Sequence, residues 1–174
     1  MSRLLFSIIA LLGGVEALAE ERSVFLQADG GERIAVATMQ TDADGSYELT
    51  MSETVFTNHF LSMRPFKCLE GPAKHWCYVP YPYPLARNVS TGATDLEYDL
   101  LFLWKGAGEY GIDMWNGVYY VIDEKPDGTL YGVMHEMDMN LLASPPPEGT
   151  RPLKDSDLHK ADVDSHWLPH LVIE

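Results

Sequence analysis

Basic residues are scarce in this chain of 174 residues, in which 12 Lys and Arg stand against 26 Asp and Glu. The formal net charge of −14 repels phosphate backbones and anionic lipid head groups, so we expect no binding to nucleic acid. Such a charge keeps a protein soluble, and it can also attract cations or a basic partner. Composition alone does not choose between these two roles.

Long apolar runs are missing after the first residues of the chain. No stretch of about 18 apolar residues follows them, so no membrane-spanning helix is expected there. The first nineteen residues have the three parts of an export signal: Arg3, the apolar run 4–12, and the small-x-small sequence 17–19. We therefore expect a signal peptide at 1–19 with cleavage before Glu20. The mature chain is then periplasmic or secreted, without stable membrane insertion after cleavage.

Cysteine is nearly absent, and both copies, Cys68 and Cys77, follow the export signal. Export places them in an oxidising compartment, where the simplest prediction is one disulfide around the turn sequence 70–72. A zinc site would need more ligands than His75, the only other candidate ligand nearby. A bonded pair also leaves no thiol to act as a nucleophile.

Known catalytic and cofactor motifs are missing too. The chain has no Gly-x-Ser-x-Gly elbow, no P-loop, no dinucleotide fingerprint and no Cys-x-x-Cys. We expect no cofactor.

Short segments with turn signals between them predict a mainly β fold. Residues 20–147 are expected to form one compact antiparallel barrel or sandwich, with a hairpin over 32–52 that turns at the Asp-Ala-Asp-Gly sequence 42–45. The segment 95–105 is either a long strand or a short helix, because its apolar run does not alternate. Residues 148–174 are expected to form a polar, partly helical tail, with a helix starting at Asp155 or Ser156.

A C-terminal meander of three strands is predicted over residues 110–139. Asn116 and Gly117 stand between apolar segments, which favours a type I′ turn, and Asp127 and Gly128 indicate a second turn.

This hairpin would place three candidate ligand-binding residues, Asp113, Trp115 and Tyr120, on one face of the sheet. Aromatic surface with one polar anchor is typical of a small-ligand pocket. The alternative is that the aromatic face belongs to the core, with Asp113 at its rim.

Paired carboxylates supply the candidate catalytic residues. On a strand, Glu136 and Asp138 would share one face, whereas His135 would point the opposite way. Two carboxylates on one face suit acid–base catalysis or cation binding if that face lines a cavity. The alternative is that the face is simply solvated.

Histidines of the tail supply the candidate metal ligands. His159, Asp162 and His166, followed by His170, would fall on one side of a helix, and such donors suit Zn or Ni. Their spacing matches no recognised metal motif, so we expect no metal site and keep these residues only as candidates.

Five sequence strings within residues 58–147 carry a resemblance: FLSMRPFKCLEGP, WCYVPYPY, TDLEYDLLFLWK, YGIDMWNGVYY and MHEMDMNLLA. The chain resembles a group of small exported proteobacterial proteins of unknown function. The resemblance implies a periplasmic setting, and it implies no activity and no functional residue.

The first hypothesis is therefore a non-enzymatic periplasmic domain that binds a small ligand or a partner of the cell envelope. The alternatives are a periplasmic hydrolase that uses the paired carboxylates, and a metal-binding accessory protein that uses His135 and the tail.

Overall fold

The structure, a computed structural model, describes residues 19–147 and 150–174, so residues 1–18 of the expected signal peptide lie outside the described residues. The described chain contains strands β1 to β11, the helix α1 and three 3-10 helices, η1 to η3. In chain order their bounds are β1 Glu20–Gln27, β2 Arg33–Thr41, β3 Tyr47–Met51, β4 Thr57–Phe60, β5 Pro65–Glu70, β6 Lys74–Tyr78, α1 Thr94–Asp99, β7 Phe102–Gly106, β8 Gly117–Glu124, β9 Leu130–Met137, η1 Met139–Leu142, η2 Asp155–Asp157, β10 His159–Lys160, η3 Val163–Ser165 and β11 His170–Ile173.

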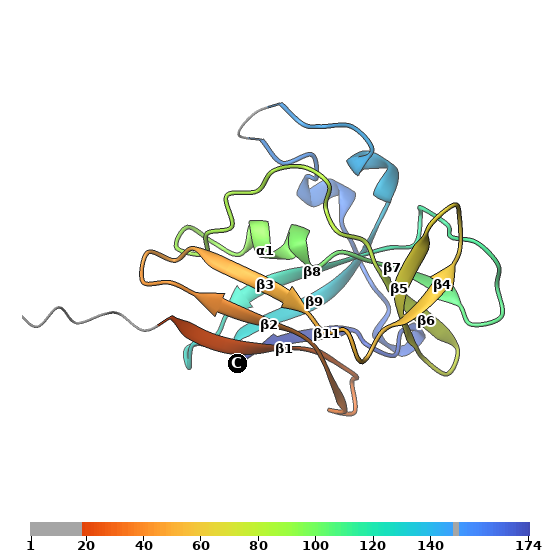
Figure 1. The fold of residues 1–174 in the computed structure, drawn as a ribbon, viewed down its shortest axis with the longest axis horizontal. Coiled ribbons are helices and arrows are strands. Elements are labelled where there is room, and N and C mark those ends of the chain that lie inside the picture. Colours follow the sequence, from red (N-terminus) through yellow and green to blue (C-terminus); the bar gives the residue numbers. More distant parts are fainter. Residues whose placement is uncertain (1–18, 148–149) are drawn as a thin grey trace, which may run out of the picture.

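All strand pairs are antiparallel and belong to one sheet, which confirms the predicted mainly β fold. The strand order is β3-β2-β1-β11-β9-β8-β7-β6-β5-β4, and β10 adds to β9. This path is open, since β3 and β4 are its two ends. Figure 1 shows β1 to β3 at one end of the molecule and β4 to β6 at the other, with β8 and β9 between them.

One predicted hairpin and the predicted disulfide are confirmed. β2 and β3 are joined by a turn in which the Gly45 N–H donates to the Asp42 carbonyl at 2.9 Å, and Gly45 has the positive φ of 83° that favours glycine. β5 and β6 place Cys68 directly opposite Cys77, with Cα atoms 3.9 Å apart, and the two form the predicted disulfide. Both half-cystines are fully buried.

The predicted meander over residues 110–139 is partly wrong. β8 and β9 form its second hairpin, where Gly128 turns with a φ of 87° as expected. Residues 107–116, however, form a loop, and β8 pairs with β7 on its other side. Asn116 and Gly117 make no type I′ turn, because the Asn116 N–H closes a turn inside the loop and Gly117 opens β8.

The segment 95–105 combines both expected alternatives, since α1 is followed at once by β7. Leu96 and Leu100, four residues apart, are both fully buried in the core, which is the helical spacing for one face. No helix in the described ranges is long and apolar enough to cross a membrane.

The tail differs from the single helix expected from Asp155 or Ser156. It contains the short 3-10 helices η2 and η3, with the two-residue strand β10 between them. Its last strand, β11, pairs with β1 and β9 inside the sheet, and Leu171 and Ile173 are fully buried there. Part of the tail thus belongs to the same sheet as residues 20–147.

Both faces of the sheet are covered. On β8, Tyr119 and Tyr120 point to opposite faces, because successive side chains of a strand alternate. Tyr120 packs in the main core with side chains of β1, β2, β6 and β11, whereas Tyr119 packs in a second apolar cluster. This second cluster includes side chains of η1 and of residues 79–85 and 153–158. In Figure 1, η1 and η2 lie on the same side of the sheet as α1. η3 lies apart from them beside β6, where the Ser165 carbonyl accepts from Lys74.

Candidate functional site

The structure separates the three residues predicted to line a ligand pocket. Tyr120 is fully buried, donating from its hydroxyl to the Leu168 carbonyl at 2.8 Å and accepting from Trp76 Nε1 at 3.1 Å. Asp113 and Trp115 lie in the loop before β8, and Trp115 is 70% exposed. The expected common face is wrong because the loop has no strand alternation.

The two predicted catalytic carboxylates also have separate surroundings. Glu136 accepts at Oε1 from Trp104 Nε1 at 3.2 Å and pairs with His166 Nε2 at 3.1 Å. Asp138 follows the end of β9 and caps η1, where its Oδ1 accepts from the Asn140 N–H at 2.9 Å. The expected shared face is wrong because β9 ends at Met137, before Asp138.

The candidate metal ligands are likewise not brought together. Within the described ranges, no group of three His, Cys, Asp or Glu side chains is placed to hold a metal ion. His159 is exposed on β10, Asp162 caps η3 at 3.1 Å from the Asp164 N–H, and His166 is buried. Their expected helical alignment is wrong because no helix spans this segment.

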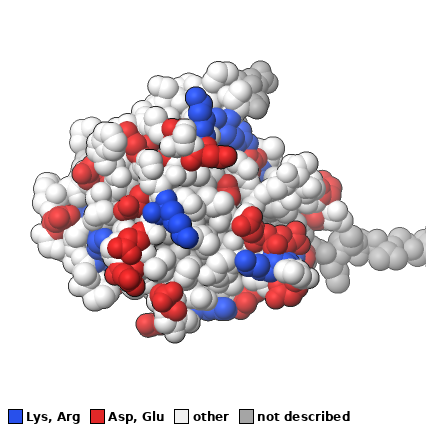
Figure 2. All heavy atoms as spheres, turned by 180° about the vertical axis from the view of Figure 1, so that it is seen from behind, with Lys and Arg blue, Asp and Glu red and all other residues white. Residues whose placement is uncertain are grey.

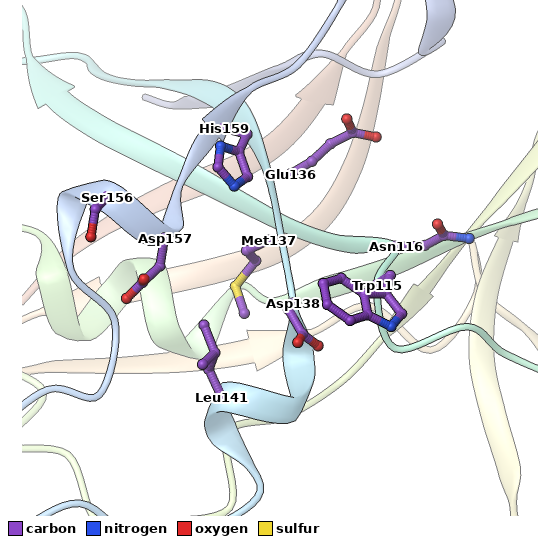
Figure 3. Close-up of a pocket in the computed structure, with 9 residues that line it drawn as sticks. All are labelled: Trp115, Asn116, Glu136, Met137, Asp138, Leu141, Ser156, Asp157 and His159. Atoms are coloured by element: carbon purple, nitrogen blue, oxygen red, sulfur yellow. The ribbon is translucent and has the colours of Figure 1, made fainter.

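One open cleft of about 610 Å³ nevertheless collects members of all three predicted sets. The loop before β8, the end of β9, η1, η2 and β10 all contribute to it. Its lining consists of Trp115, Asn116, Glu136, Met137, Asp138, Leu141, Ser156, Asp157 and His159 (Figure 3).

The cleft has an aromatic side and an acidic character. Figure 3 shows Trp115 and Asp138 on one side, Asp157 on the opposite side, and Leu141 between them. The Glu136 side chain points away from Leu141, toward its partners Trp104 and His166. An exposed indole thus stands beside carboxylates in a space that is open to solvent.

Charge in the cleft is of one sign. Three carboxylates line it, from Glu136, Asp138 and Asp157, and its lining has no Lys or Arg. Elsewhere acidic and basic side chains are interspersed, and Figure 2 shows acidic groups spread over the rear face with basic ones between them. The cleft therefore favours a cationic group.

His166 holds Glu136 from behind the cleft. Its side chain is 2% exposed, and the Lys74 ammonium lies 3.5 Å from Nδ1, donates to the Ser165 carbonyl at 2.8 Å and stacks on the Trp104 ring. Because an ammonium only donates, Nδ1 is the acceptor and Nε2–H donates to Glu136. Burial, and then Lys74, lower the pKa of His166, whereas Glu136 raises it less.

A second, smaller cavity of about 160 Å³ shares two elements with the cleft. Met114 lines this cavity and its neighbour Trp115 lines the cleft, while Leu142 lines the cavity and its neighbour Leu141 the cleft. The two hollows are therefore neighbours. The lining of the smaller one is mostly apolar: Arg64, Val79, Pro80, Tyr81, Pro82, Leu101, Met114, Met139, Leu142 and Ala143.

Two of the exposed large apolar side chains, Trp115 and Leu141, line the cleft. Among the described residues, the exposed large apolar side chains occur in three segments only: the β4–β5 hairpin, the loop before β8, and η1. They are Phe60, Met63, Tyr110, Trp115 and Leu141. Figure 1 shows the β4–β5 hairpin and the loop before β8 at the same end of the molecule.

Sequence reasoning missed three buried acids on α1. Asp95, Glu97 and Asp99 are each at most 8% exposed. Asp95 pairs with Arg151, and Asp99 pairs with Arg87 at 2.7 Å, so α1 holds both the tail and the segment that follows β6. The available signal was three acids at alternate positions directly before the apolar run 100–104.

Glu97 is the third of these acids. Its Oε1 accepts from the Ile122 N–H of β8 at 2.7 Å, and its Oε2 accepts from the Tyr119 hydroxyl. The Ile122 N–H lies beyond the last residue pair between β7 and β8, so the Glu97 carboxylate supplies its acceptor in place of a neighbouring strand. Burial raises the pKa of Glu97, while the Ile122 and Tyr119 hydrogen bonds oppose that rise.

No protein-family model matches this chain, and comparison with the curated proteins and with the solved structures finds no significant match.

Proposed function

We propose that this chain is a non-enzymatic exported domain that docks a partner of the cell envelope. The docking surface is defined here as Phe60 and Met63 of the β4–β5 hairpin, Tyr110 and Trp115 of the loop before β8, and Leu141 of η1. The observation that carries this proposal is that the exposed large apolar side chains of the described chain are confined to these three segments, two of which lie at the same end of the molecule while Trp115 and Leu141 line one cleft. Patches of this kind mark interaction sites in soluble proteins.

A partner suits this surface better than a small ligand or a substrate. Pockets for small ligands enclose most of the ligand, whereas this cleft is open and its aromatic ring is largely exposed. A hydrolase that uses Glu136 and Asp138 is less well supported, because each carboxylate is occupied by separate donors. A metal-binding role has no cluster of ligands among the described residues.

Export is the second part of the proposal. It is supported by the signal features of residues 1–19 and by the buried disulfide between Cys68 and Cys77, since such bonds persist in oxidising compartments. Fractionation and N-terminal sequencing test it. We expect a mature chain that starts at Glu20 in the periplasmic fraction, and a cytoplasmic pool that retains Met1 would overturn it.

Site-specific photo-crosslinking in intact cells tests the docking surface. A photoreactive phenylalanine replaces Tyr110, which is 90% exposed, and a matched one replaces Glu32, which is exposed in the β1–β2 turn. We expect one discrete protein adduct from position 110, none from position 32, and loss of the adduct when Trp115→Ala is added. No adduct at 110, or equal adducts at both positions, would overturn the proposal.

A further inference from the structure

We propose that the partner presents an arginine to the acidic cleft and, close to it in sequence, an apolar side chain to the neighbouring 160 Å³ cavity. The occupant is thus a basic and apolar protein segment. This inference rests on the proposed function, because it names the chemistry of the partner that docks there.

Charge complementarity selects a cationic group for the cleft. The three carboxylates of Glu136, Asp138 and Asp157 line it without any Lys or Arg, and the whole chain carries a net charge of −14. An acidic segment would meet like charges there, whereas a basic one gains both in encounter rate and in the bound state.

The exposed indole selects arginine over lysine. Trp115 lies at the edge of the same cleft as Asp138. A planar guanidinium stacks on an aromatic face and gives two parallel N–H groups to a carboxylate, whereas an ammonium is a more strongly hydrated point charge. One arginine can therefore use both features of the cleft.

The smaller cavity selects an apolar neighbour. Leu101, Met139 and Leu142 line it together with Val79 and Tyr81. This hollow is also open to solvent, so an apolar side chain of a partner, such as leucine or phenylalanine, can enter it from outside and cover its apolar lining. Arg64 is the one charged residue of its lining.

Geometry links the two contacts. Two pairs of consecutive residues are divided between the hollows. Trp115 and Leu141 line the cleft, and their neighbours Met114 and Leu142 line the smaller hollow. Because consecutive Cα atoms are about 3.8 Å apart, the two hollows are close enough for side chains about two to four residues apart in a partner segment.

A library of random dodecapeptides displayed on phage is the probe, selected on the purified mature chain with its disulfide intact. Selection on Trp115→Ala removes background binders. We expect enriched peptides to carry Arg two to four positions from Leu, Phe or Ile. Enrichment of acidic peptides, of apolar peptides without Arg, or of no sequence would overturn the inference.

Titration of an enriched peptide against variants then tests each hollow. Asp138→Asn removes a charge but keeps an η1 cap, and we expect it to weaken binding at least about tenfold at low salt. Asp127→Asn, in the β8–β9 turn outside the cleft, removes the same charge and should change affinity less than about twofold. Ala143→Leu fills the smaller cavity from its exposed rim and should abolish the preference for an apolar neighbour. Equal effects of the two Asp variants would overturn the arginine contact, and an unchanged preference would overturn the apolar one.

The crosslinking described above separates the two failures. If position 110 captures a partner whose contact segment, mapped by mass spectrometry, lacks Arg, docking stands and this inference fails. If position 110 captures nothing, both fail. An adduct with the mass of two copies of this chain, with concentration-dependent dimerisation that Trp115→Ala abolishes, would make the occupant a second copy and overturn both.

Discussion

The buried imidazole of His166 donates from Nε2 to Oε1 of Glu136 at 3.1 Å, and thereby joins the tail to the end of β9. These residues were predicted as parts of different sites, a metal site and a catalytic pair. In the fold, His166 packs edge-on against Trp76 and Trp104, and Lys74 approaches its Nδ1. The neutral form of His166 fits this position, because Lys74 leaves no room for a second proton on Nδ1.

We predict that the burial of His166 beside Lys74 makes stability fall as the pH drops below about 6.5. Burial and Lys74 lower the pKa of His166 in the folded state, although Glu136 and Asp162 oppose this. In the unfolded chain, histidine takes a proton at about pH 6.5, so the unfolded state binds protons first as the pH falls. The contribution of His166 to the unfolding free energy is therefore complete above about pH 6.5 and decreases as the pH falls below that value.

Urea unfolding at a series of pH values measures this effect. We expect His166→Gln to reduce the slope of unfolding free energy against pH in this window, and the exposed variant His159→Gln to leave it unchanged. Some slope remains in His166→Gln, because burial and Lys105 also lower the pKa of His75. Equal slopes in His166→Gln and wild type would contradict the prediction.

Local rules of sequence predicted the parts of the fold that depend on local chemistry. The turns at Gly45 and Gly128 need glycine for their positive φ, and both were found from their Asp-Gly sequences. The disulfide followed from two cysteines and an export signal. Asn116 and Gly117 show the limit, because the same turn chemistry was present there but β8 found its second neighbour in β7.

The candidate site depends on contacts that are distant in sequence. Trp115, Asp138 and His159 reach one cleft only because β8, β9 and β10 are neighbours and the tail folds back over the sheet. Their positions in the sequence indicate three separate sites, because nothing local links them. The buried acids of α1 were missed for a similar reason, because partners such as Arg87 and Arg151 lie in loops that show no periodicity.

We predict that Gly117→Ala destabilises the protein by about 1–3 kcal/mol through overpacking. A Cβ atom at Gly117 would lie 2.6 Å from the Met137 carbonyl oxygen of β9 and 2.8 Å from Met139 Cγ. The cost comes from this close approach of two strands and not from a positive φ. Thermal unfolding measures it, with Gly108→Ala as the matched control, because a Cβ there meets nothing within 4 Å. Equal melting temperatures for the two variants would contradict the close approach.

We predict that loss of the disulfide costs roughly 2.5–3 kcal/mol of unfolding free energy, because the bond closes a loop of about ten residues in the unfolded chain. The double variant Cys68→Ala/Cys77→Ala should unfold at lower urea than oxidised wild type. Reductant should lower the midpoint of wild type toward that of the variant and leave the variant unchanged. If reduced and oxidised wild type unfold at the same urea concentration, the bond does not stabilise this fold.

We predict that Glu97, whose pKa is raised, makes stability fall as the pH rises, whereas His166, whose pKa is lowered, makes it fall as the pH drops. Burial raises the pKa of this carboxyl above its ordinary value of 4.5. Between 4.5 and the folded pKa, the folded state holds more protons than the unfolded state, so stability from Glu97 is lost as the pH rises through this window. At neutral pH the protein therefore carries the cost of a buried charge that accepts hydrogen bonds from Ile122 and Tyr119.

Glu97→Gln removes the charge, keeps an oxygen for the Ile122 N–H, and offers an amide N–H to the Tyr119 hydroxyl. We expect this variant to be more stable than wild type at pH 8, with a difference that shrinks toward zero at pH 4. Glu97→Ala is the matched control, since it leaves the β8 amide unpaired and should cost about 1–3 kcal/mol at every pH. Urea unfolding of the three proteins between pH 4 and pH 8 decides the matter. A Gln variant that is as unstable at pH 8 as the Ala variant would show that the ionised carboxylate itself stabilises the contact between α1 and β8.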